Sequence, residues 1–198
     1  MPRLGPEART ERRQRLLEAA WRCAARRGFR DITIDDVCLE AGVSKGAFYL
    51  YFATKQDLLM GLLDDDAAEV ERQIDELEQR AMPQAERVRR FTRWMLERGP
   101  DSARAQVGAD LWTAALTDDA LRDRFSQVIA RRRSHLRSWI AAGVLDGELV
   151  DTPANALASV LLALEDGLLL HAAVDPTAFR WERVRRALNA ILNGLQVS

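Results

Sequence analysis

Cysteine and histidine are scarce in this chain of 198 residues, which contains only two of each. Two thiols cannot form a disulfide framework or a four-thiolate metal site, so a small disulfide-stabilised scaffold is excluded. We interpret Cys23 and Cys38 as small buried side chains in a reducing cytoplasm, without a redox role. His135 and His171 are isolated and lack metal-ligand spacing, so we expect no metal ion and no cofactor.

Long apolar runs are also missing. Residues 1–15 are polar and rich in arginine, without the apolar core of a secretory signal. The longest apolar stretch, residues 154–174, carries Glu165 and Asp166 in its middle. Each carboxylate at the centre of a bilayer would cost about 2.5–3.5 kcal/mol. We therefore predict a buried helix in this stretch, and a cytoplasmic protein without a membrane partner.

Common catalytic motifs are absent as well. The chain has no Walker lysine loop, no GxGxxG motif, no HExxH motif and no GxSxG motif. We therefore expect no catalytic residue and no enzymatic activity. A helical enzyme whose carboxylates meet only in the folded chain stays open as an alternative.

Charge is balanced overall but uneven along the chain. The 29 basic and 30 acidic residues leave a net charge of -1, which points to no partner. The first 30 residues, however, hold nine arginines against three glutamates. This basic front end is a weak indication of an anionic partner.

Apolar residues recur at spacings of three and four, which is typical of amphipathic helices. Pro83 and the pair Gly99 and Pro100 interrupt this pattern, and Pro153 and Pro176 suit the first turn of a helix. We predict an all-α protein with about nine helices. The expected ranges are 10–27, 34–41, 45–51, about 55–80, 84–98, 103–116, 119–142, 153–173 and 176–195.

Two short helices joined by a glycine-containing turn form the most informative segment. Thr33 and Asp36 have the spacing of a capping box at the start of the first of them. Gly42 can adopt a positive φ and end that helix, and Ser44 can cap the next one at once. A tight turn of this kind between two helices is the helix-turn-helix arrangement.

The second of these helices carries side chains that suit a DNA major groove. Lys45 and Tyr49 can donate hydrogen bonds to bases or phosphates, and Gly46 and Ala47 keep the backbone close. The helix starts near Thr33 and Lys55 offer backbone N–H groups to phosphates. An ordinary helical hairpin with solvated charges is the alternative interpretation.

The segment ITIDDVCLEAGVSKGAFYLYFATKQDLL, residues 32–59, resembles the N-terminal domain of the TetR family of transcriptional regulators. The resemblance implies a dimeric repressor with a three-helix DNA-binding domain at 1–54 and a ligand-binding and dimerisation domain at 55–198. Cys38 stands where the family usually has alanine, which keeps a small apolar volume. The positions that the resemblance assigns to DNA contacts are Thr33, Ser44, Lys45, Gly46, Ala47, Tyr49, Tyr51 and Lys55.

The last two helices suit dimerisation, as the resemblance also implies. The final helix carries an apolar stripe at spacings of three and four, and a single chain that exposed this stripe would present a large apolar patch. The alternative is that the apolar faces of these two helices both pack inside a single chain. The residues expected at a dimer interface are Leu161, Leu164, Leu168, Val184, Leu188, Ile191 and Leu195.

Three tryptophans on the middle helices, Trp94, Trp112 and Trp139, suit the wall of an apolar ligand pocket, although helical aromatics are more often plain core. Glu165 or His171 could hold one polar group of the ligand, but a structural partner is the alternative for both.

Together these observations predict a regulator that binds double-stranded operator DNA as a homodimer and is released by a small, largely apolar effector. The alternative is a DNA-binding activator or partner-controlled regulator that takes no small molecule. An enclosed apolar cavity near the middle helices would favour the first hypothesis, and a filled core with an exposed apolar groove the second.

Overall fold

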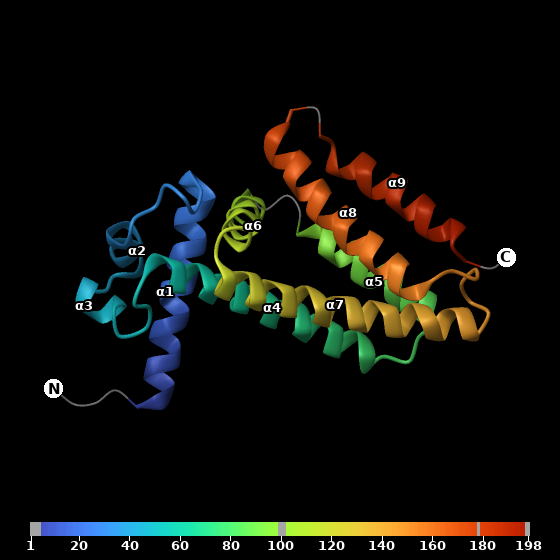
Figure 1. Cartoon of the computed structure of the whole chain (residues 1–198), viewed down its shortest axis with the longest axis horizontal. Coiled ribbons are helices and arrows are strands. Elements are labelled where there is room, and N and C mark those ends of the chain that lie inside the picture. The colour runs from blue at the N-terminus through green and yellow to red at the C-terminus, as the bar shows by residue number, and fades with distance from the viewer. Residues whose placement is uncertain (1–4, 99–101, 178, 197–198) are drawn as a thin grey trace. The chain divides into compact units, whose positions relative to one another are not determined.

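The computed structural model describes residues 5–98, 102–177 and 179–196, and these parts form nine α-helices. Apart from one isolated bridge between Leu149 and Gln196, no β-structure occurs in the described parts, so the all-α prediction is confirmed (Figure 1). The helices are α1 (Pro6–Arg27), α2 (Ile34–Ala41), α3 (Lys45–Phe48), α4 (Lys55–Glu78), α5 (Gln84–Glu97), α6 (Ser102–Ala115), α7 (Asp119–Leu145), α8 (Ala154–Val174) and α9 (Trp181–Gly194).

Most helix ends lie within a few residues of the expected ones, but the start of α9 does not. It begins at Trp181 rather than at Pro176. The Asp175 carbonyl accepts a hydrogen bond from the Phe179 N–H at 3.0 Å, and the Asp175 carboxylate accepts one from the Thr177 hydroxyl at 3.1 Å. Pro176 therefore sits in a turn between α8 and α9. The expected break at Gly99 and Pro100 lies outside the described residues.

The chain divides into two compact units, one formed by residues 1–67 with 102–122 and the other by 68–101 with 123–198. This division differs from the expected one at residue 54, because α6 and the first half of α4 group with the N-terminal helices. In the first unit α1 packs against both α2 and α6. Gly61 permits close packing there, since a Cβ at this position would lie 2.8 Å from the Phe52 ring.

The second unit has a core of aliphatic side chains and two aromatic rings, Phe91 and Trp139, whose centroids lie 5.7 Å apart, edge to face. Within this unit α5 packs against α8 and α9. Arg87 is buried, and within the described residues its guanidinium pairs with no carboxylate. Instead its guanidinium donates to the Leu77 carbonyl at 3.2 Å and to the Arg80 carbonyl at 3.1 Å. Arg87 thereby ties α5 to the end of α4 and the residues after it, where the Leu77 carbonyl also accepts from the Arg80 N–H at 3.3 Å.

Helix α8 is less covered than expected. By length and composition alone it is the one helix of the described residues that could cross a membrane, yet only 17% of its most apolar window is buried. The expectation of a buried helix is therefore wrong for the single chain. Val160 and Leu164 are exposed on α8, and Ile191 is exposed on α9.

Candidate nucleic-acid interface

The turn between α2 and α3 has the geometry that the sequence predicts. The Thr33 hydroxyl accepts from the Asp36 N–H at 3.1 Å, and the Asp36 carboxylate accepts from the Thr33 N–H at 2.8 Å, which completes a capping box. Helix α2 ends at Gly42, which adopts the left-handed conformation with φ of 65°. Ser44 then caps α3 by accepting a hydrogen bond from the Ala47 N–H at 3.2 Å. These contacts create a helix-turn-helix.

Helix α3 presents one face to the core and another to solvent. Phe48 is fully buried and its ring contacts those of Phe52 and Tyr49, at centroid distances of 5.7 and 5.6 Å. Lys45 and Gly46 are exposed, as is Tyr49, whereas Ala47 and Tyr51 are half-buried. We call residues 45–51 the recognition segment. It presents the Lys45 ammonium and the Tyr49 phenol to solvent, and the buried Phe48 ring anchors it to the core.

The Lys45 ammonium already has an anionic neighbour. Its nitrogen lies 2.9 Å from one carboxylate oxygen of Asp35, at the start of α2. This hydrogen-bonded carboxylate raises the pKa of Lys45, so the side chain stays cationic. Both side chains are exposed, and exposed ion pairs are weak and exchange readily. A DNA phosphate or base could therefore replace Asp35 as the acceptor.

Lys55, the other lysine of the chain, is held differently. Its ammonium donates to the Arg30 carbonyl at 2.7 Å and lies 5.2 Å from the centroid of the Phe29 ring. Burial lowers the pKa of Lys55. The N–H of the same Arg30 donates to Asp110 of α6 at 3.1 Å. Lys55 thus fixes the loop that leads into α2, and its expected contact with a phosphate stays a prediction.

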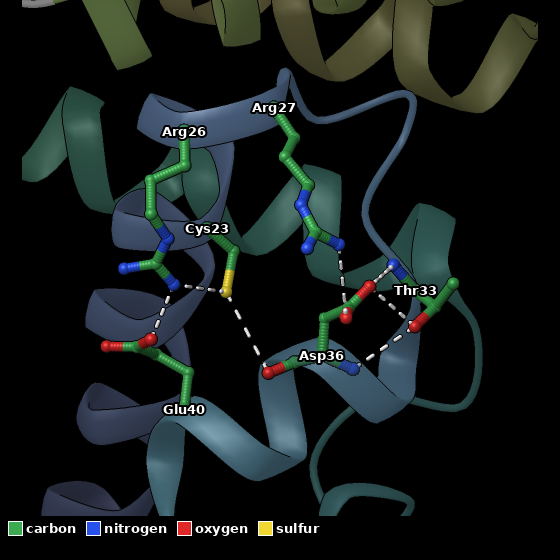
Figure 2. A network of polar contacts seen from close by, with 6 residues as sticks. All are labelled: Cys23, Arg26, Arg27, Thr33, Asp36 and Glu40. Carbon is green, nitrogen blue, oxygen red and sulfur yellow. Dashed lines mark hydrogen bonds and ion pairs between the residues drawn. The ribbon is translucent and has the colours of Figure 1, made fainter.

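Acidic side chains neutralise several arginines of the basic front end, as Figure 2 shows. Glu40 accepts from Arg22 at 2.7 Å and from Arg26 at 2.5 Å, and hydrogen bonds from these two side chains lower the pKa of Glu40. Arg27 pairs with Asp36 at 3.5 Å. These arginines join α1 to α2, so part of the positive charge counted in the sequence stabilises the domain.

Cys23 lies inside this network. Its thiol is buried, donates weakly to the Asp36 carbonyl at 3.8 Å and accepts from Arg26 at 3.4 Å (Figure 2). Burial raises the pKa of the Cys23 thiol, and the same cause raises that of Cys38. Both thiols are therefore neutral at pH 7, as small buried side chains are expected to be.

Comparisons with known proteins match both parts of the chain. Residues 16–61 match the family described as bacterial regulatory proteins of the tetR family, and residues 84–197 match the C-terminal part of the BetI-type transcriptional repressors. The chain belongs to the TetR family. It is a TetR-family transcriptional regulator with a BetI-type C-terminal part, and the resemblance seen in the sequence is confirmed.

Three relatives of this TetR-family regulator cover nearly its whole length. The regulator PksA of Bacillus subtilis is 29% identical over 90% of this chain and 86% of its own. The regulator BetI of Vibrio parahaemolyticus is 27% identical over 98% of this chain and 95% of its own. The crystal structure of a transcriptional regulator from Saccharomonospora viridis in complex with choline is 29% identical, covers 96% of this chain and 99% of that one, and has a TM-score of 0.84.

The residues expected to bind the effector fall in different places in this TetR-family regulator. Trp139 is buried in the core of the second unit, and Trp94 is half-buried there, with its ring 6.3 Å from that of Phe91. Trp112 belongs to the first unit and is partly exposed. On α8, Glu165 is half-buried and His171 is exposed.

The expected interface residues of this TetR-family regulator also separate into groups. Leu161 and Leu188 are buried in the core of their own chain, so they are not free to meet a partner. Leu164 and Ile191 are exposed. The half-buried residues are Leu168, Val184 and Leu195. The periodicity of the sequence did not indicate Val160 as an interface residue, although it is exposed. Helix α8 is apolar on several sides, and periodicity does not show which of them the same chain covers.

Proposed function

We propose that this chain is a repressor that grips operator DNA as a homodimer and leaves it when a small, largely apolar effector binds. The observation that carries the DNA-binding part is the anchored recognition segment, on which Lys45 and Tyr49 face solvent above the buried Phe48. Side chains at the start of such a segment reach base edges in the major groove. The BetI-type family description, which names repressors, supports the direction of regulation.

The exposed apolar side chains of α8 and α9 support a second copy of the chain as the partner. Val160 and Ile191 are each 59% exposed in the single chain, on two helices of the same unit. A symmetric dimer would cover these side chains with their own equivalents. We place Leu164 in the same interface, and we assign Leu161 and Leu188 to the core that supports it.

The aromatic side chains of the second unit support an effector site next to α5 and α7. The buried hydroxyl of Thr92 on α5 has no hydrogen-bond partner among the described residues, so this unit holds an unpaired polar group near its aromatic core. The Arg98 guanidinium lies 4.7 Å from the centroid of the Trp94 ring, so a cationic effector would compete with Arg98 for that ring. We therefore propose a largely apolar effector with one polar group. The choline complex of the Saccharomonospora viridis relative supplies the contrasting cationic compound, so choline is tested beside apolar compounds.

We further propose that the protein works in the cytoplasm and catalyses no reaction. The matched families and relatives are described as transcriptional regulators, and transcription takes place where the DNA is.

Selection of duplexes from random double-stranded DNA tests the DNA-binding part. Wild type should enrich one sequence, and Lys45→Ala with Tyr49→Ala should bind that sequence at least tenfold more weakly while keeping its helical circular dichroism. Arg90→Ala, an exposed change in the other unit, is the matched control. Unchanged affinity of the double variant would contradict the proposed interface.

Tryptophan fluorescence tests the effector part. Choline and a set of apolar compounds are titrated with and without the selected duplex. A true effector should bind the free protein more tightly than the DNA complex, by the factor with which it weakens DNA binding. Compounds that all bind both forms equally would favour a regulator controlled without a small molecule.

A further inference from the structure

Leu50 is a large apolar side chain that the fold leaves open, between the two tyrosines of the chain. It is 69% exposed, although it lies only two residues from the fully buried Phe48 and the nearly buried Phe52. Exposing a leucine forgoes the stabilisation that burial would provide. Single exposed leucines are common on protein surfaces, so the place of Leu50 in the fold has to indicate any function.

The backbone places Leu50 on the exposed side of α3 and the turns that follow it. Helical turns continue beyond α3, because the Leu50 N–H donates to the Ala47 carbonyl at 3.4 Å and the Phe52 N–H donates to the Phe48 carbonyl at 3.1 Å. At about 100° per residue, Leu50 falls beside Gly46 and Tyr49 and away from the buried phenylalanines.

Gly46 precedes Leu50 by four residues and leaves space beside it. A Cβ at Gly46 would have only the Ser44 hydroxyl within 4 Å, at 4.0 Å. Side chains on a helix lean toward its N-terminus, so Leu50 lies on the side of the segment where Gly46 leaves open space. A flat group can therefore approach both the backbone and the leucine methyl groups.

We propose that Leu50 contacts the 5-methyl group of a thymine and makes this regulator prefer thymine at one position of its half-site. The proposal rests on the proposed DNA-binding function. Base edges in the major groove are hydrogen-bond donors and acceptors, except for the thymine methyl, which is apolar. Lys45 and Tyr49 serve the acceptors, whereas Leu50 has no group that could donate or accept. Lys45 and Tyr49, which are exposed on the same segment, favour DNA over an apolar protein partner.

Deoxyuridine tests this contact, since replacing dT by dU removes only the methyl group. Each thymine of the selected duplex is replaced in turn, and affinities are measured by fluorescence anisotropy with full-length wild type and Leu50→Ala. Wild type should lose about fourfold in affinity for each methyl that Leu50 contacts. Leu50→Ala should bind the dT and dU duplexes equally. Leu116→Ala, which changes another exposed leucine of the same unit, should keep the wild-type response.

Four results would overturn the proposal: no loss with dU at any position, a loss that persists in Leu50→Ala, an equal loss of Leu50→Ala on selected and random duplexes, or unchanged DNA binding of Leu50→Ala. The third would mark a contact made with any sequence, and the fourth would indicate that Leu50 contacts a protein instead of DNA. These outcomes are distinguishable from failure of the DNA-binding function, in which wild type would enrich no sequence at all.

Discussion

The Lys45 ammonium lies 2.9 Å from a carboxylate of Asp35, so the first residue of the recognition segment is paired with an acid from the preceding helix. The pair keeps the ammonium beside Asp35, at the surface that we propose for DNA, until a phosphate or base replaces the carboxylate. It also puts a negative charge where phosphates would approach. Asp35 therefore opposes binding while it positions the group that promotes binding.

This pairing predicts opposite effects of two substitutions. Asp35→Asn should raise affinity for duplex DNA at low salt, and the gain should shrink as salt screens the removed repulsion. Lys45→Ala should lower affinity and reduce the slope of log affinity against log salt by about one. Anisotropy titrations at several salt concentrations measure both, with the exposed change Glu18→Gln as control. Equal affinities of wild type and Asp35→Asn at every salt concentration would refute the prediction.

The exposed apolar side chains of α8 and α9 predict that a single charge prevents dimer formation. Ile191→Glu places a carboxylate in the proposed apolar interface, where an unpaired charge is costly. Sedimentation should show monomers at micromolar concentration, with a folded spectrum. Leu145→Glu changes an exposed side chain at the end of α7 and should leave the dimer intact. A wild-type chain that sediments as a monomer would exclude the dimer itself.

The buried contacts of Arg87 predict that its replacement lowers the free energy of unfolding, although no ion pair is lost. Arg87→Met would remove the guanidinium hydrogen bonds to the Leu77 and Arg80 carbonyls, and hydrogen bonds that involve a charged group contribute about 1.5–3 kcal/mol. Urea denaturation should show a lower free energy of unfolding. Arg90→Met removes an exposed arginine of the same helix and should change it little. Similar midpoints for the two variants would show that the capping contacts contribute nothing.

The ion pairs of Glu40 predict loss of stability in acid. Hydrogen bonds from Arg22 and Arg26 lower the pKa of Glu40 in the folded state, so the unfolded chain binds the proton more readily. The contribution is complete above the ordinary pKa of about 4 and disappears as the pH falls below it. Urea midpoints measured from pH 7 to 3 should separate wild type from Glu40→Gln at neutral pH and converge in acid. A gap that stays constant over this range would mean that Glu40 is not responsible.

Local features of the sequence predicted the helices and the recognition segment. The Thr33 capping box, the positive φ of Gly42 and the Ser44 cap depend on neighbouring residues, and their geometry is present as expected. The buried positions of Phe48 and Phe52 follow from helical periodicity. The predicted start of α9 at Pro176 is wrong, because Asp175 and Pro176 belong to a turn before the helix. Apolar periodicity does not reveal such a turn.

The tertiary structure decided which of the expected side chains are available. Leu161 and Leu188 belong to the same apolar stripes as Leu164 and Ile191, yet the first two are buried and the last two are exposed. The sequence predicts DNA contacts for both Lys45 and Lys55. In the folded chain Lys45 pairs with Asp35, whereas Lys55 donates to the Arg30 carbonyl. A sequence specifies the periodicity of a helix and its caps through local backbone geometry. Which edge of each helix is covered, and which acceptor each cation meets, depends on segments far away in the chain that only folding brings together.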